Sequence, residues 1–126
     1  MAKILVIEDN PTNMKLVSLL LERQGHTVER ASSAEQGIEF ARRSRPEIVI
    51  MDIQLPGMDG LAATRILKTD EETKNVKILA LTALAMNGDK ERIQKAGCDA
   101  YVAKPLRYKE FLSALDGLLP KTEAGC

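Results

Sequence analysis

The chain has 126 residues, 44% of them hydrophobic and 29% charged, which suits one globular domain with a packed core. Lys and Arg together number 18, as do Asp and Glu, and this balance argues against a nucleic-acid-binding surface, which needs an excess of basic residues. No apolar run approaches the roughly 18 residues of a membrane-spanning helix, and the first residues lack a signal-peptide pattern, so we expect no membrane insertion and a cytoplasmic protein with reduced thiols at Cys98 and Cys126.

Short apolar segments alternate with longer segments of helical periodicity along the chain. Asn10 and Pro11 follow the first apolar segment and are a preferred N-cap and a preferred first helical residue. Gly25 and Gly97 mark the ends of the first and fourth helical segments. The pattern predicts strands over residues 4–7, 27–30, 47–52, 76–82 and 100–103. It predicts helices over residues 11–24, 33–43, 61–68, 87–96 and 108–119.

This alternation predicts an α/β fold made of five βα units. Because crossovers between parallel strands are right-handed, the units should form a doubly wound parallel five-stranded sheet with helices on both faces. The segment over residues 47–52 is the most apolar, so we place it at the centre of the sheet. We expect a single domain over residues 1–120, followed by a short polar tail over residues 121–126.

Polar residues capable of chemistry lie at the ends of the predicted strands. Parallel sheets bind ligands outside the carboxyl ends of their strands, so these side chains should meet at one edge. Three carboxylates suit a hard divalent cation such as Mg²⁺ better than zinc, and an ammonium and a hydroxyl suit a phosphoryl group. The sequence therefore predicts a metal site beside a phosphate, built from Glu8, Asp9, Asp52, Thr82 and Lys104.

Four sequence motifs resemble those of the receiver domain of two-component response regulators. They are IEDN, IVIMDIQLPGMDG, ALTA and KPL, in this order, and the resemblance covers residues 3–106. The segments NMKLVSLLLERQG and MDIQLPGMDGL make the chain most similar to single-domain regulators of the DivK type. The resemblance implies a flavodoxin-like fold with strand order 2-1-3-4-5, which periodicity alone does not provide.

The resemblance also implies a role for each residue of the acidic site. Asp52 should be the phosphoacceptor, and its carboxylate should attack the phosphorus of a histidine-bound phosphoryl group. Asp9 and Asp52 should bind Mg²⁺ directly, with Mn²⁺ as a possible substitute, and Glu8 should act through a metal-bound water. Gln54 should contribute its backbone carbonyl, so that the nature of its side chain matters less.

The remaining implied roles concern the response to phosphorylation. Lys104 should pair with the phosphoryl oxygens, and the Thr82 hydroxyl should move toward the phosphate. Tyr101 should then turn inward, and the Lys104–Pro105 peptide is a candidate for the cis isomer. Few apolar residues anchor the fourth helix, so we expect the partner surface to consist of this helix, the fifth strand and the fifth helix, over residues 84–112.

The resemblance implies a signalling protein, including cell-cycle regulation, and not an enzyme of ordinary turnover. The phosphate donor should be a histidine kinase or a histidine phosphotransferase, and the targets should be proteins. We expect a monomer. Leu84, two residues after Thr82, should hinder an attacking water, so we expect slow self-dephosphorylation.

Three alternatives stay open at this point. A phosphatase of the haloacid dehalogenase type fits poorly, because its D-x-D motif belongs at the first strand, where this chain has EDN. An interaction module that takes no phosphate is disfavoured, because Asp52 and Lys104 are both present. The chain could also be a receiver excised from a hybrid histidine kinase, although its initial Met and short polar tail favour a free-standing protein.

Overall fold

A computed structural model describes residues 2–53, 60–82, 87–104 and 107–119, except for the side chains of residues 87–90. Within these ranges strand and helix alternate as predicted, and each boundary differs from its prediction by one residue at most. The strands are β1 (Lys3–Ile7), β2 (Thr27–Ala31), β3 (Ile48–Asp52), β4 (Lys77–Thr82) and β5 (Ala100–Ala103). The helices are α1 (Pro11–Arg23), α2 (Ala34–Ser44), α3 (Gly60–Thr69), α4 (Asn87–Ala96) and α5 (Tyr108–Leu118).

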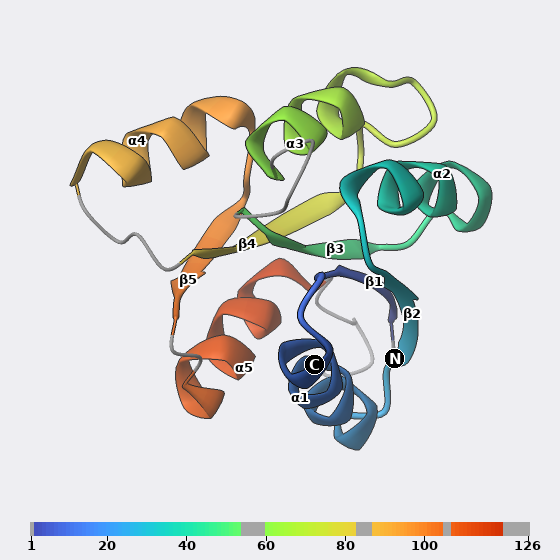
Figure 1. Cartoon of the computed structure of the whole chain (residues 1–126), viewed down its shortest axis with the longest axis vertical. Coiled ribbons are helices and arrows are strands. Elements are labelled where there is room, and N and C mark those ends of the chain that lie inside the picture. Colours follow the sequence, from blue (N-terminus) through green and yellow to red (C-terminus); the bar gives the residue numbers. More distant parts are fainter. Residues whose placement is uncertain (1, 54–59, 83–86, 105–106, 120–126) are drawn as a thin grey trace, which may run out of the picture.

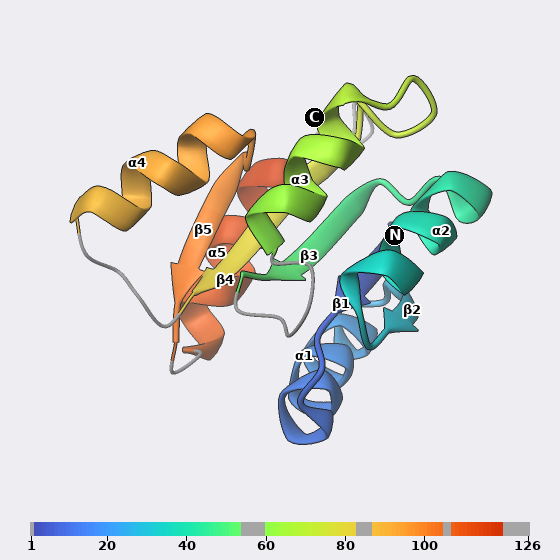
Figure 2. The same cartoon turned by 45° about the horizontal axis from the view of Figure 1, so that its top comes forward.

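The strands form one parallel sheet in the order β2-β1-β3-β4-β5, which confirms the order that the resemblance implied. Figure 2 shows β3 between β1 and β4. All five residues of β3 are buried, which confirms the prediction that this segment lies at the centre of the sheet. The register pairs Ile7 of β1 with Met51 of β3, so the residues that follow this pair, Glu8 and Asp52, lie side by side at the carboxyl edge of the sheet.

Helices cover both faces of the sheet. Figure 1 shows α1 and α5 on one face and α2, α3 and α4 on the other. None of the helices in the described ranges has the length and apolar character needed to cross a bilayer.

The two faces of the sheet carry separate hydrophobic cores, because successive side chains of a strand point to opposite faces. Leu5 and Val49 pack with α2 and α3 on one face, whereas Ile4 and Ile48 pack with α1 and α5 on the other. Central strands therefore need an apolar residue at every position, which explains the unbroken apolar runs in the sequence.

Helix α4 packs on a third and much smaller cluster. Its buried residues Ile93 and Ala96 contact Leu61 of α3 and Ala80 of β4, with Tyr101 half-buried at the margin. The burial of Ile93 and Ala96 agrees with the expectation that few apolar residues anchor this helix.

The predicted N-terminal cap of α1 is confirmed. The side chain of Asn10 accepts hydrogen bonds from the backbone N–H groups of Thr12 and Asn13, and Pro11 is the first helical residue. The prediction that α2 begins at Ser33 was one residue early. Ser33 has extended backbone and caps the helix from outside, with its side chain accepting from the Gln36 N–H.

Candidate functional site

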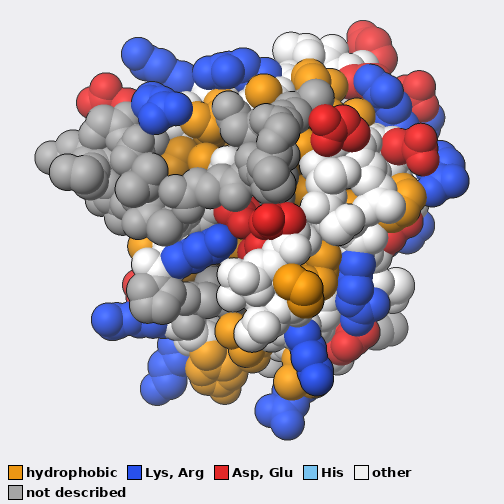
Figure 3. Space-filling view, in the orientation of Figure 1, with side chains coloured by type: hydrophobic (Ala, Val, Ile, Leu, Met, Phe, Trp, Pro, Cys, Tyr) orange, Lys and Arg blue, Asp and Glu red, His pale blue; other side chains and the backbone are white. Residues whose placement is uncertain are grey.

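Three acidic side chains meet where β1 and β3 end. Oxygen atoms of Glu8, Asp9 and Asp52 all lie within 4.8 Å of one another. Glu8 and Asp52 are each only 2% exposed, whereas Asp9 is open to solvent. The face seen in Figure 3 carries a group of acidic side chains near its centre, with a basic side chain directly beside it. The predicted clustering of the three acids at one edge of the sheet is therefore confirmed.

Lys104 brings a positive charge to this cluster from the end of β5. Its Nζ lies 3.1 Å from Asp52 Oδ2 and 3.6 Å from Glu8 Oε1. Its backbone N–H donates to the Thr82 carbonyl at 2.7 Å, so the pairing of β4 with β5 fixes where its side chain begins. Among the described residues, one ammonium thus faces three carboxylates, and this local imbalance favours binding of a further cation.

Glu8 carries the clearest electrostatic signature of the site. The pKa of its carboxyl group is raised from 4.5 to about 7, with burial as the largest cause; the neighbouring Asp52 also acts to raise it, whereas the Asn10 N–H and Lys104 act to lower it. Glu8 Oε2 accepts a hydrogen bond from the Asn10 N–H at 3.1 Å. Glu8 Oε1 is buried and has no hydrogen-bond partner in the described part of the chain. Such an atom is suited to a water on a bound cation.

The donor set fits Mg²⁺. All three groups are carboxylates, and hard oxygen ligands of this kind suit Mg²⁺, or Mn²⁺ in its place, better than zinc. Glu8, Asp9 and Asp52 could hold such a cation together. The exposed position of Asp9 leaves room for the waters and phosphoryl oxygens that Mg²⁺ retains in its shell.

The two predicted switch residues lie on neighbouring strands at different depths. Thr82 is the last residue of β4 and is 1% exposed. The register pairs Leu81 with Asp52, so Thr82 lies one position beyond the partner of the proposed phosphoacceptor. Tyr101 lies two positions before Ala103, the β5 partner of Thr82, and is half-buried against the α4 cluster.

Three predicted features lie outside the described residues. They are the backbone carbonyl of Gln54, the peptide bond before Pro105 and the side chain of Leu84. These features stay predictions.

Sequence reasoning missed the role of Gly60, the first residue of α3. A Cβ atom at this position would lie 2.5 Å from the Asp52 carbonyl oxygen and 2.7 Å from the Ile53 Cα. The Gly60 N–H also donates to the Ile53 carbonyl at 3.0 Å, so the start of α3 packs directly against the end of β3. A glycine in a loop segment cannot reveal this contact, because the contact is made in tertiary structure.

Comparisons with known proteins agree with this geometry. Residues 4–116 match the model of the response regulator receiver domain family. The chain is 40% identical over 116 residues to the polar-differentiation response regulator DivK of Brucella abortus, which covers 92% of this chain and 94% of the relative. The same identity and coverage hold for DivK of Brucella anthropi.

Solved structures give the same result. The receiver domain of the sensor histidine kinase PA1611 from Pseudomonas aeruginosa, described with a magnesium ion coordinated in its active-site cleft, is 36% identical, with a TM-score of 0.85 over 93% of this chain and 96% of that one. The chemotaxis protein CheY4 of Vibrio cholerae is 26% identical, with a TM-score of 0.89 over 94% of this chain and 99% of that one.

Proposed function

Because the chain belongs to the response regulator receiver domain family, we propose that it is a cytoplasmic phosphoacceptor that takes a phosphoryl group from a histidine kinase or histidine phosphotransferase. The acceptor is Asp52, and the transfer requires Mg²⁺. The observation that carries the proposal is the buried Asp52 carboxylate, which lies 3.1 Å from Lys104 Nζ and beside two further carboxylates.

The chemical step is a displacement at phosphorus. A carboxylate oxygen of Asp52 forms the new P–O bond while the P–N bond to the donor histidine breaks. The imidazole leaves with the electron pair of that bond and takes a proton from solvent, so an acyl phosphate and a neutral histidine result. A bound Mg²⁺ would supply positive charge next to the phosphoryl oxygens, held by Asp9 and Asp52, by Glu8 through a water and by the Gln54 backbone carbonyl.

Of the protein's own groups, Lys104 and the buried Asp52 would contribute most to the rate of phosphoryl transfer. The Lys104 ammonium already faces the acceptor, so it needs little rearrangement to stabilise charge on the phosphoryl oxygens. Positioning and charge neutralisation are sufficient here, because phosphoryl transfer asks for little covalent chemistry from the protein.

Phosphorylation would then change the surface formed by α4, β5 and α5. The Thr82 hydroxyl would move to the phosphate, and Tyr101 would turn toward the space it leaves. The small cluster under α4 supports this proposal, because a weakly anchored helix can shift between two positions at low cost. A groove beside β5 and α5, lined by Tyr101, Lys109 and Ser113 among others, offers a place for a downstream protein partner.

The experiment that tests the proposal is intact-mass measurement after mixing the protein with Mg²⁺ and a small-molecule phosphodonor, with Asp52→Asn as control. The expected result is a metal-dependent gain of one phosphoryl group that Asp52→Asn abolishes. If Asp52→Asn still gained a phosphoryl group, Asp52 would not be the acceptor. No gain in a wild-type protein that binds Mg²⁺, even with a purified histidine kinase present, would favour an interaction module.

A further inference from the structure

Asn10 makes three hydrogen bonds with neighbouring residues of the turn between β1 and α1, through its backbone N–H and its side chain. Its backbone N–H donates to Glu8 Oε2 at 3.1 Å. Its side-chain Oδ1 accepts from the backbone N–H groups of Thr12 at 2.9 Å and Asn13 at 3.1 Å. Asn10 therefore links an acidic side chain of the site to the first turn of a helix.

These bonds constrain both acids of the turn. With Glu8 Oε2 bound by the Asn10 N–H, the other oxygen, Oε1, lies 3.6 Å from Lys104 Nζ in the acidic cluster. Asp9 lies between Glu8 and Asn10 in the chain, so the backbone on both sides of it is held. In this turn its exposed carboxylate lies with those of Glu8 and Asp52 in the acidic cluster.

We propose that Asn10 is a positioning residue for the cation site, whose side chain holds the turn in the shape that aims Glu8 and Asp9 at one Mg²⁺. The inference rests on the proposed function, because it concerns the same site. Asn10 itself need not touch the cation. Residues that orient metal ligands commonly change metal affinity by about tenfold or more when they are replaced.

The chain offers a conservative variant and a matched control. Asn10→Ser keeps a side-chain oxygen that can cap the helix and adds no charge, whereas Asn10→Ala removes the acceptor. Ser33 caps α2 in the same manner, through a bond of 3.1 Å from the Gln36 N–H, and that bond does not involve an acidic residue. Ser33→Ala thus removes a helix cap of the same kind without touching the turn of β1 and α1.

The test is a titration with Mg²⁺ that is monitored by ¹H–¹⁵N NMR. Urea unfolding confirms that each variant is folded. We expect the Mg²⁺ dissociation constant to rise about tenfold in Asn10→Ala. We expect Asn10→Ser to restore most of the affinity and Ser33→Ala to leave it unchanged.

Other outcomes would overturn the inference in distinguishable ways. Wild-type affinity in Asn10→Ala would refute the positioning role and leave the proposed function intact. An equal loss in Ser33→Ala would assign the effect to general loss of helix stability. A wild-type protein that fails to bind Mg²⁺, or that binds it no better than Asp9→Asn, would refute the metal site and with it the inference.

Discussion

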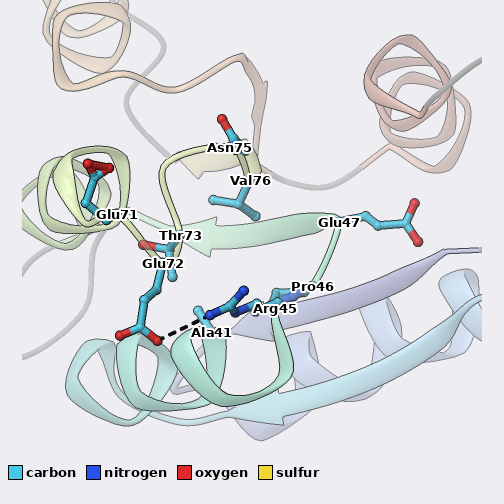
Figure 4. A pocket seen from close by; sticks show the side chains of 9 residues that line it. All are labelled: Ala41, Arg45, Pro46, Glu47, Glu71, Glu72, Thr73, Asn75 and Val76. Carbon is cyan, nitrogen blue, oxygen red and sulfur yellow. Dashed lines mark ion pairs between the residues drawn. The ribbon is translucent and has the colours of Figure 1, made fainter.

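The two edges of the sheet are both rich in charge, but they hold that charge differently. At the amino edge, Arg45 pairs with Glu72 at 3.7 Å across a cavity of about 250 Å³, between the turn before β3 and the loop before β4 (Figure 4). These two side chains are 68% and 54% exposed. At the carboxyl edge, Lys104 Nζ lies 3.1 Å from Asp52 Oδ2, and the two side chains are only 22% and 3% exposed.

This difference shows what distinguishes the site. It is not the presence of charged residues but the burial of carboxylates that the neighbouring positive charge does not balance. Exposed pairs such as Arg45–Glu72 are solvated on both sides and contribute little to stability. In the part of the chain that the structure describes, the carboxyl edge places two buried acids and one exposed acid beside the Lys104 ammonium. Stability does not explain these buried acids, because matched charges or apolar residues would stabilise the fold more at these positions. Their presence indicates a functional role.

The largest expected effect concerns how tightly each edge is packed. Gly60→Ala should lower the free energy of unfolding by about 3 kcal/mol, because its new methyl group would overlap the backbone of Asp52 and Ile53. Gly117→Ala, near the other end of the fold in α5, has open space around the new Cβ and should be neutral or stabilise by up to about 1 kcal/mol. Urea unfolding measures the free energy of unfolding of both variants. Equal changes in the two would mean that the backbone around residue 60 can accommodate a Cβ atom.

The next effect concerns the two ion pairs. Lys104→Met should lower the free energy of unfolding at pH 8 by about 2 kcal/mol, since it leaves buried acids without their ammonium. Arg45→Met should change it by less than about 0.5 kcal/mol, because the Arg45–Glu72 pair is exposed. Urea unfolding in metal-free buffer measures both. Comparable losses in the two variants would contradict the contrast between the edges.

Glu8 should give the carboxyl edge a pH dependence of its own. Its pKa is raised to about 7 in the folded protein, against 4.5 when unfolded, so between these values the folded state binds more protons. The free energy of unfolding of the metal-free protein should therefore decrease as pH rises through this window. Glu8→Gln should remove this contribution, and Glu72→Gln should not. A Glu8→Gln profile parallel to that of the wild type would contradict the raised pKa.

The smallest effect belongs to the amino edge and has the opposite sign. His26 Nδ1 accepts a hydrogen bond from the Ala2 N–H at 3.1 Å, and burial, aided by the N-terminal charge, lowers the pKa of His26 below 6.5. The unfolded state then binds more protons, so this contribution is present above pH 6.5 and is lost as pH falls through the lowered pKa. Comparing urea unfolding of wild type and His26→Asn from pH 5 to 7 tests it. No difference in slope would show that His26 is solvated.

Much of the architecture could be predicted because its signals are local. Asn10 and Pro11 predict the start of α1, Asn10 through capping and Pro11 through its fixed φ angle. Both effects act within the first turn of the helix. The grouping of Glu8, Asp52 and Lys104 could also be predicted, since parallel strands bring their carboxyl ends to one edge. The strand order could not be worked out from periodicity, because which strand pairs with which is a long-range choice, and it came from the resemblance to a family.

The sequence by itself determined the alternation of strands and helices, the apolar centre of the sheet and the identity of the acids at its edge. Tertiary structure alone decided that Glu8 is buried while its neighbour Asp9 is exposed, and that Gly60 lies against the backbone of Asp52. Periodicity and capping act between residues close in the chain, so they can be seen in sequence. Burial, a raised pKa and steric contact depend on neighbours that only the folded chain brings together.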